Sequence, residues 1–212
     1  MIAAFAVTAA LASCAPPVAA GNSTQLVDVV ASQPQTTYAS VSLWTKTRGC
    51  WRKVAGPWNA RVGRNGLSSH HREGDGTTPI GSYGFASTVY GVAANPGVRF
   101  RYHRLVCGDW WDEDPASPTY NTFEHLRCGA TPPFRGDSEA LWRQTRAYRF
   151  FAVIDYNVHP VVRGRGSAMF VHVDTGSPTN GCVSLPAARL VRLLSWLAPS
   201  AAPRMAIRIA GG

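Results

Sequence analysis

The chain has 212 residues, which suits one folded domain with one core once a short export segment is set aside. Hydrophobic residues make up 45% and charged residues 16%, as in an ordinary globular protein rather than a disordered one. The net charge of +9 comes from scattered arginines, and no nucleic-acid motif accompanies them, so a nucleic-acid partner is excluded. We expect a solvated basic surface, with adhesion to an anionic envelope polymer as the alternative.

Residues 1–20 have the features of an export signal. Ile2–Ser13 is almost wholly apolar or small, and Pro16 and Pro17 then stop any helix. The apolar run is too short to span a bilayer but fits the core of a signal peptide. No Lys or Arg precedes Lys46, so the usual basic start is absent. We expect an exported protein of the cell envelope.

Two cleavage sites compete within this segment. Leu11–Cys14 is similar to a bacterial lipobox, in which Cys14 would be lipidated and would tether the protein to a membrane. Val18–Ala20 is similar to an ordinary signal-peptidase site with small residues. The mature protein is therefore either lipid-anchored or secreted.

The cysteines favour disulfides over a metal site. No C-x-x-C pair is present, so a zinc site is not expected. Cys107 and Cys128 flank a Trp- and Pro-rich loop, and we pair them, a closure that stabilises by about 3 kcal/mol in the chain-entropy model. Cys50 is then left over as a partly buried small residue, and Cys182 stands apart.

In chain order, a polar lead-in over 21–37 with one apolar stretch precedes a mainly β domain over 38–212. Strands are predicted at 38–44 and 51–54, which form a hairpin, and then at 83–90, 98–105, 148–156, 168–173 and 205–209. Residues 107–137 lack periodicity and are expected to be a long functional loop, followed by a short helix over 138–146. One convincing helix is capped by Ser184 and carries an apolar stripe from Leu190 to Leu197.

The residues with chemical potential lie between the last strands. A strand ends in His172, and a turn-rich loop then leads to Gly181 and Cys182. An imidazole can take the proton of a thiol and make it nucleophilic. Gly181 allows close approach to a substrate carbonyl, and the backbone N–H of Cys182 can stabilise an oxyanion. The alternative is a structural His and a buried Cys, and spacing alone does not decide between them.

Two motifs resemble the L,D-transpeptidase (YkuD) family of peptidoglycan cross-linking enzymes. His172 on a strand, followed by the Thr-Asn-Gly-Cys segment 179–182, is similar to the family's His and Ser/Thr-x-Gly-Cys signature. The segment 78–83, Thr-Pro-Ile-Gly-Ser-Tyr, resembles its upstream Thr-Pro-x-Gly-x-Tyr/Phe segment. The resemblance covers roughly residues 38–210. The loop 110–121 also resembles that of a subgroup of exported actinobacterial proteins.

The resemblance implies a β-sandwich or barrel with one helix near its C-terminal end, without cofactor or metal. Cys182 would attack the bond between the third-position diamino acid and D-Ala of a peptidoglycan stem tetrapeptide. D-Ala would leave, and an amine of a second stem would accept the acyl group in a 3→3 cross-link. His172 would be the base, oriented by the backbone at Val173. Carbapenems acylate this cysteine in many relatives, and no stable protein partner is implied.

The chain departs from the family pattern in three ways. The spacing from His172 to Cys182 is shorter than usual, Asn180 replaces a common second His, and Ser184 stands where an Arg often follows the Cys by two. We expect substrate contacts from the cysteine loop and from the aromatic loop, where the alternative is a loop packed by its own aromatics. The expected contacts are Thr179, Asn180, Ser184, Trp110, Trp111, Tyr120 and Asn121.

Two other functions remain open for this fold. An L,D-carboxypeptidase would hydrolyse the same bond instead of transferring the acyl group. A non-catalytic wall-binding module would keep the fold without turnover.

Overall fold

The computed structural model describes residues 14–136 and 138–211, in which ten strands join one curled sheet. In sheet order the strands are β6 (Gly81–Tyr83), β15 (Arg204–Ile209), β1 (Gln25–Ala31), β2 (Tyr38–Thr47), β3 (Cys50–Arg61), β14 (Val183–Leu185), β13 (Phe170–Val173), β12 (Phe151–Ile154), β7 (Phe85–Gly91) and β8 (Arg101–Arg104). The chain is mainly β, as the sequence predicts. Most of the predicted export segment lies outside the described residues.

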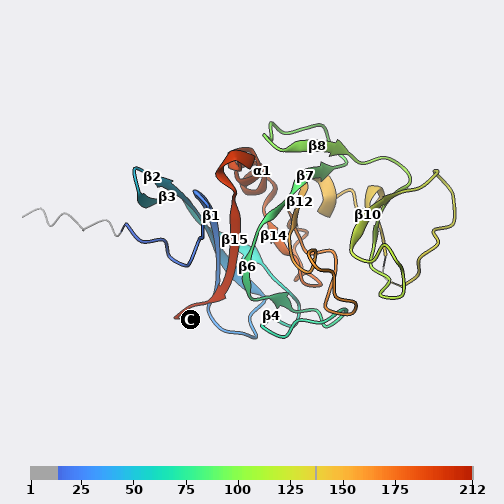
Figure 1. The fold of residues 1–212 in the computed structure, drawn as a ribbon, viewed down its shortest axis with the longest axis horizontal. Helices are drawn as coiled ribbons and strands as arrows, with labels where there is room; N and C mark the ends of the chain where they lie inside the picture. The colour runs from blue at the N-terminus through green and yellow to red at the C-terminus, as the bar shows by residue number, and fades with distance from the viewer. Residues whose placement is uncertain (1–13, 137, 212) are drawn as a thin grey trace, which may run out of the picture.

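The predicted hairpin is confirmed. β2 and β3 pair antiparallel up to Thr47 and Cys50, so the turn consists of Arg48 and Gly49. Both turn residues have positive φ, +50° and +83°, as a two-residue turn that matches the strand twist requires. Figure 1 shows this hairpin at one end of the long axis and β10 (Thr122–His125) at the other.

The predicted lead-in contributes to the sheet. The apolar stretch within 21–37 forms β1, which pairs parallel with β15 and antiparallel with β2. Asp28 on β1 is buried and receives two hydrogen bonds from the guanidinium of Arg208 on β15, at 2.9 and 3.1 Å. The folded sheet therefore includes residues before position 38.

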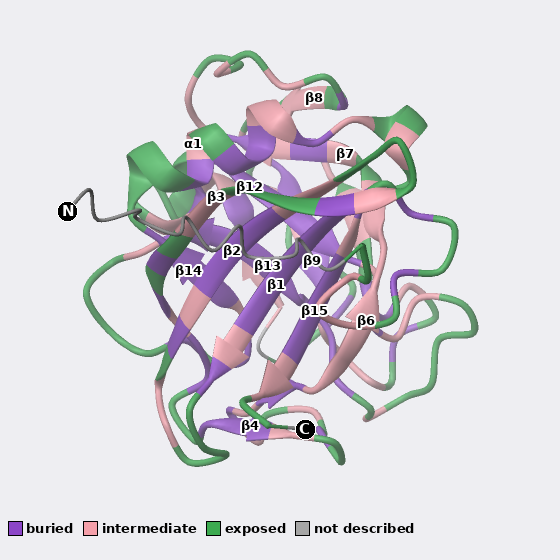
Figure 2. Cartoon of the chain, turned by 90° about the vertical axis from the view of Figure 1, so that its left-hand side faces the viewer, coloured by how far each residue is buried: buried purple, intermediate pink, exposed green. Residues whose placement is uncertain are grey.

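The main core lies between the curled sheet and helix α1 (Ala187–Trp196). The apolar stripe is confirmed, since Leu190, Leu193 and Leu194 are fully buried against strands that include β13 and β14. Figure 2 shows exposed residues on the outer face of α1 and buried strands below it. The predicted cap is wrong: Pro186 occupies the N-cap position without a side-chain hydrogen bond, and Ser184 lies inside β14.

Residues 107–137 are more ordered than their lack of periodicity predicts. A three-stranded sheet forms there, because short strands that pair locally need no long alternating run. It comprises β10, β9 (Asp109–Asp112) and β11 (Glu139–Ala140) in the order β10-β9-β11. The helix predicted over 138–146 is wrong, since β11 and the 3-10 turn η1 (Leu141–Arg143) occupy that segment. The remaining short elements are β4 (Leu67–Ser68), β5 (Thr78–Pro79), η2 (Ala147–Arg149) and η3 (Pro199–Ala201).

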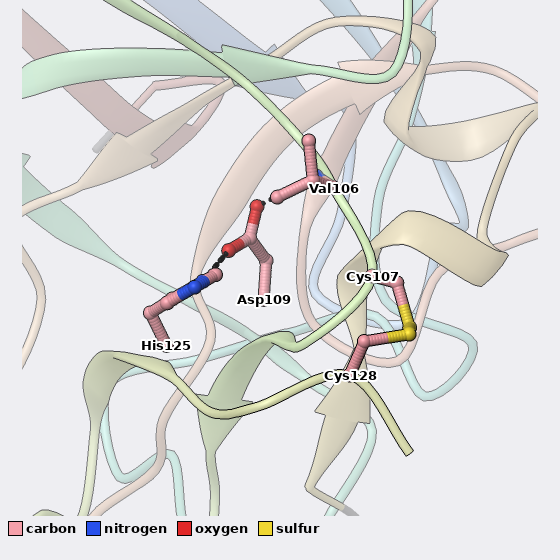
Figure 3. The surroundings of a disulfide bond; sticks show 5 residues. All are labelled: Val106, Cys107, Asp109, His125 and Cys128. Atoms are coloured by element: carbon pink, nitrogen blue, oxygen red, sulfur yellow. Dashed lines mark hydrogen bonds and ion pairs between the residues drawn. A yellow bond between two sulfur atoms is a disulfide. The ribbon is translucent and has the colours of Figure 1, made fainter.

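The Cys107–Cys128 disulfide is confirmed, and a buried carboxylate supports it (Figure 3). Asp109 is fully buried and accepts hydrogen bonds from the backbone N–H of Val106 at 2.8 Å and from His125 Nδ1 at 2.6 Å. The bridge and the carboxylate together fix both ends of the loop that carries β9 and β10.

Cys50 is not left over, as the sequence analysis expects. It forms a disulfide with Cys14, which joins the N-terminal segment to the β2–β3 hairpin. One sulfur atom cannot hold both a lipid thioether and a disulfide, and cleavage after Ala20 would remove Cys14. Both cleavage sites considered above are therefore chemically incompatible with this bridge.

The two bridges predict the thiol count of protein exported with Cys14 present and purified without reductant. Denatured chain should take up one iodoacetamide before reduction, at Cys182, and five after it. Mass spectrometry of the intact chain measures the count. The Cys182→Ser variant is the control and should take up none before reduction. Three labels on the unreduced wild-type chain would mean that the bridge between Cys14 and Cys50 does not form.

Candidate active site around Cys182

Strand pairing brings His172 and Cys182 to one face of the sheet. β13 and β14 run parallel, with Val171 opposite Val183, and both valines point into the main core. Phe170 and Cys182 instead pack in a second apolar cluster on the opposite face. Because alternate residues of a strand point to opposite faces, His172 shares the face of Phe170 and therefore that of Cys182.

The sulfur of Cys182 lies against the backbone of the neighbouring chain segment. It accepts a hydrogen bond from the N–H of Phe170 at 3.4 Å, and its thiol donates to the carbonyl of Ala168 at 3.2 Å. Among the described residues, Cys182 is the one cysteine outside a disulfide, and it is partly exposed. Within the described residues, no hydrogen bond joins the sulfur to the ring of His172. The thiol proton therefore points toward the carbonyl of Ala168.

The imidazole of His172 is buried and held in one orientation. Nδ1–H donates to the carbonyl of Val173 at 2.9 Å, which confirms the expected backbone contact and leaves the lone pair on Nε2. The ring of Tyr148 packs edge-on against it, with centroids 5.8 Å apart. Burial lowers the pKa of His172, although the hydrogen bond to Val173 and the charge of Asp174 oppose the shift. The ring is therefore neutral at neutral pH.

The surroundings of Cys182 disfavour the thiolate. Burial raises its pKa well above the usual 9.0, and the carboxylates of Glu139 and Glu113 raise it further. The N–H of Phe170 lowers it in part. The resting pair thus consists of a neutral thiol and a neutral imidazole, and a base is needed to remove the proton during attack.

Two distant segments fix the backbone of the cysteine. The hydroxyl of Thr179 donates to the carbonyl of Cys182 at 2.6 Å, and the hydroxyl of Thr78 donates to the same oxygen at 3.3 Å. Thr78 in turn accepts the N–H of Gly63 at 2.8 Å. Thr78 and Thr179 belong to the two sequence motifs identified above, so the motifs meet at one oxygen atom.

Gly181 is required by its conformation and by its neighbours. Its φ is +143°, and a Cβ there would lie 2.8 Å from Cε of Met169 and 3.0 Å from the carbonyl of Thr77. Its N–H donates to Thr179 Oγ1 at 3.2 Å. The Gly181 N–H is therefore engaged, which leaves the Cys182 N–H as the better candidate for an oxyanion donor.

Cys182 opens onto a hollow of about 430 Å³ with charged walls. Asn180, a predicted substrate contact, lines it, and its amide oxygen accepts a hydrogen bond from Arg64. The other charged side chains of the lining are Glu73, Glu113, Glu139 and Arg143. The sequence alone predicts none of these five charged residues, because no motif links Arg64 and Glu73 to Glu113, Glu139 and Arg143.

Tyrosines hold two of these carboxylates. Glu73 accepts a hydrogen bond from Tyr120 and another from Ser167 at 2.7 Å. Glu139 accepts one from Tyr148, whose ring also contacts His172, and burial followed by the charge of Glu139 raises the pKa of Tyr148. Neither tyrosine lines the hollow, so both hold the glutamates through hydrogen bonds from outside it.

The aromatic loop supports the cysteine instead of lining its hollow. Trp111 is buried and donates to Asn121 Oδ1 at 3.1 Å, and the same oxygen accepts the N–H of Ala168, also at 3.1 Å. Ala168 is the residue whose carbonyl holds the thiol. Trp110 packs edge-on against Phe134 and against Trp142 of η1. Within the described residues, Trp110, Trp111, Tyr120 and Asn121 are absent from the lining.

Two further predicted contacts are buried. Thr179 is 7% exposed and is engaged with the cysteine loop itself. Ser184 is fully buried opposite His172 on the adjacent strand, and its hydroxyl has no hydrogen-bond partner among the described residues. Neither residue can touch a substrate in this conformation.

A metal site is not evident in the described part of the chain, where no group of three or more His, Cys, Asp or Glu side chains is arranged to hold an ion. No helix in residues 14–136 and 138–211 combines the length and apolar character needed to cross a membrane.

Comparison with known families identifies the domain. The model of the YkuD L,D-transpeptidase catalytic domain matches residues 29–205. The chain belongs to this family. No curated protein and no solved structure matches it. The match begins within β1, in agreement with the place of that strand in the sheet. The two motifs that resemble this family are the segments that meet at the Cys182 carbonyl. The catalytic roles of His172 and Cys182 stay predictions.

The first prediction from this site concerns Thr179. Thr179→Val removes one hydroxyl from the Cys182 carbonyl and the acceptor of the Gly181 N–H, so we expect a loss of about 1–3 kcal/mol in the free energy of unfolding. We also expect acylation by a carbapenem to slow by roughly 100-fold, because the nucleophile loses its fixed position. Urea unfolding and mass spectrometry measure the two effects. Thr179→Ser keeps the hydroxyl and should resemble the wild type. Equal stability and equal acylation rates in all three proteins would mean that the Thr179 hydroxyl does not hold the Cys182 carbonyl in place.

The second prediction concerns pH. Because burial raises the pKa of Cys182 above 9.0 and lowers that of His172 below 6.5, no thiolate–imidazolium pair forms at rest. Alkylation of Cys182 by iodoacetamide, which requires the thiolate, should therefore keep rising beyond pH 9. Carbapenem acylation needs neutral His172 and should fall only below pH 6.5. A plateau of the alkylation rate between pH 6 and 8, with the fold checked by circular dichroism, would show an ion pair instead.

Proposed function

We propose that this domain is a cysteine acyltransferase acting on peptidoglycan stem peptides, with Cys182 as nucleophile and His172 as base. One observation carries the proposal: the only free thiol of the described residues opens onto a charged hollow while both YkuD motifs hold its backbone. A buried structural cysteine would need neither feature.

The first half-reaction forms an acyl-enzyme. Cys182 Sγ attacks the carbonyl carbon of the bond between the diamino acid and D-Ala, and the thiol proton passes to His172 Nε2. The tetrahedral oxyanion accepts a hydrogen bond from the Cys182 N–H. The C–N bond then breaks, His172 protonates the departing amine, and a thioester and free D-Ala remain.

The second half-reaction transfers the acyl group. An amine of a second stem attacks the thioester carbonyl and gives a proton to His172. The C–S bond breaks, and the proton returns to the sulfur of Cys182. The product is an amide that joins the third residues of two stems, and the enzyme returns to its neutral resting pair.

Substrate binding must redirect the thiol. At rest the thiol donates to Ala168, and the ring of His172 lies on the same sheet face from the adjacent strand. A substrate carbonyl that enters the hollow displaces the sulfur from Ala168 toward His172 Nε2. The high thiol pKa then protects the cysteine from oxidation until a substrate arrives, since the thiolate is the species that oxidises.

Charged walls of the hollow suit a zwitterionic stem. Arg64 and Arg143 can bind carboxylates of the peptide. In the family an arginine is common at the position of Ser184, but Ser184 is fully buried here and cannot bind a carboxylate of the substrate. Glu113 and Glu139 lie close enough to affect the charge of Cys182 and can bind an ammonium group. The same carboxylates can also orient a water molecule, which favours L,D-carboxypeptidase hydrolysis as the alternative outcome.

Peptidoglycan is an envelope polymer, so the proposal places the protein outside the cytoplasm. Two disulfides support this location, because such bonds persist in oxidising compartments. Substrate contact rather than a stable protein partner accounts for the charged hollow.

A stem tetrapeptide tests the reaction. Wild-type protein should release D-Ala and form a cross-linked dimer, both measured by liquid chromatography and mass spectrometry. Free tripeptide without dimer would mean hydrolysis. Neither product, with unchanged binding to sacculi, would mean a non-catalytic wall-binding module and would end the proposal.

Variants assign the residues. A carbapenem should add once to the wild type and not to Cys182→Ala, and an adduct on both would remove Cys182 as nucleophile. His172→Gln should keep the fold but lose roughly two to four orders of magnitude in acylation rate, as expected for removal of a general base. Arg52→Gln alters an exposed arginine outside the hollow and serves as the matched control for both assays.

A further inference from the structure

A second hollow, larger than the first, lies on the other side of His71. It has a volume of about 770 Å³, against about 430 Å³ for the hollow at Cys182. His71 is 5% exposed and lines both, so its ring is part of the wall between them. The other walls come from the loop 155–165, from β6 and from Arg204 on β15.

Arginines dominate the charge of this second hollow. Arg72, Arg163, Arg165 and Arg204 line it, and Asp155 is the one acidic side chain of its lining. Within residues 14–136 and 138–211, none of these four guanidinium groups forms an ion pair with a carboxylate. Arg204 donates hydrogen bonds to Ser82, which leave its charge in place. Positive charges gathered in a concave site without carboxylate partners create a potential that attracts an anion.

The loop that carries two of these arginines is built to hold its shape. The amide of Asn157 donates to the carbonyls of Val162 and Gly166 at 2.9 and 2.8 Å and accepts the N–H of Val162 at 2.8 Å. Arg163 donates to the carbonyl of Pro115 at 2.6 Å. The hollow therefore exists before a ligand binds, which lowers the entropy cost of binding.

Asp155 gives the hollow a second requirement. Burial raises its pKa, and the nearby His159 and Arg204 oppose that rise. Among the described residues, no hydrogen bond to its carboxylate is recorded, so it can accept one from a ligand. A bare anion would be repelled by this carboxylate, whereas a ligand hydroxyl would donate to it. The ligand must therefore carry hydroxyl groups as well as negative charge.

Two tyrosine rings supply an apolar wall. Tyr83 and Tyr156 pack edge to face with centroids 5.5 Å apart. Their hydroxyls donate to the carbonyls of Ile80 and Arg165, at 2.8 and 2.7 Å. Tyr156 is only 8% exposed and packs in the main core, so the partly exposed ring of Tyr83 is the one that can meet the C–H face of a sugar.

We propose that this hollow binds a phosphate-bearing saccharide, with Arg72 and Arg165 at the phosphate and Asp155 at a sugar hydroxyl. Arg72 and Arg165 are exposed, and neither guanidinium donates a recorded hydrogen bond within the described residues, so both are available. A phosphate monoester matches several arginines better than a single carboxylate does, because it carries more charge and more acceptor oxygens. The volume accommodates a sugar ring as well as the phosphate.

The site is independent of the chemistry proposed at Cys182, which does not line it. A phosphosaccharide of an envelope polymer and a free sugar phosphate share this chemistry. Because both hollows are lined by His71, an envelope polymer bound in the arginine-lined hollow could hold the protein in place while a stem peptide occupies the hollow at Cys182.

Calorimetric titration of the full chain at low, constant ionic strength tests the proposal, with glucose 1-phosphate, inorganic phosphate and glucose as probes. Glucose 1-phosphate should bind about tenfold or more tightly than either of the other two. The double variant Arg72→Gln/Arg165→Gln should weaken its binding by about tenfold or more, because charged hydrogen bonds are lost. The matched control Arg52→Gln/Arg101→Gln removes two exposed arginines outside the hollow and should leave binding unchanged.

Asp155→Asn separates the saccharide from a bare ion. Loss of the carboxylate should tighten inorganic phosphate and weaken glucose 1-phosphate. Equal losses in the two double variants, or inorganic phosphate binding as tightly as glucose 1-phosphate, would overturn the proposal. Cys182→Ala should bind like the wild type, so a failure here is distinct from a failure of the acyltransferase. Wall polymer that competes with glucose 1-phosphate only when its phosphates are intact would identify the polymer as the source.

Discussion

The carbonyl oxygen of Cys182 is the point on which the site depends. Hydroxyls of Thr78 and Thr179 both donate to it, from segments about 100 residues apart in the chain. A carbonyl has two lone pairs, so two donors saturate it and remove its freedom to rotate. The cysteine is then delivered to β13 in one orientation, where Phe170 and Ala168 receive the sulfur. The parallel pairing of β13 with β14 and the positive φ of Gly181 also contribute to the fixed position of the Cys182 peptide.

A fixed but neutral nucleophile has a consequence for selectivity. Many cysteine enzymes keep a thiolate ready through a nearby positive charge, and such a thiolate is exposed to any electrophile or oxidant. Here burial and the carboxylates of Glu113 and Glu139 keep the proton on Cys182, and burial keeps His172 neutral. On the proposed mechanism, Cys182 therefore reacts only when a substrate carbonyl reaches its sulfur and His172 takes the thiol proton. Tyr148 links the two groups that set these protonation states, since its ring packs on His172 and its hydroxyl donates to Glu139.

The sequence predicts features that depend on a local pattern. It does not predict features that depend on distant residues meeting in the folded chain. Alternating residues and a short glycine-containing connection predict the β2–β3 hairpin, and the leucine stripe predicts α1, because each signal lies within a few residues. Cys182 and His172 are found through their motif. Arg64, Glu73 and Glu139 are not, because no sequence motif links them and only the folded chain brings them to one hollow. The pairing of Cys14 with Cys50 likewise depends on where the segment before β1 lies in the folded chain, which spacing does not reveal.

Folding also sorts the charge that composition shows only as a total. The +9 of the chain reads as scattered arginines in the sequence, yet four of them meet around one hollow with a single acid, while the hollow at Cys182 has three glutamates and two arginines. His71 lines both hollows, so the two sites are neighbours. On the two proposals made above, an anionic polymer segment is favoured on the arginine side. On the proposed function, an amine-bearing segment is favoured beside Cys182, and this division of charge would orient a substrate before the thioester forms.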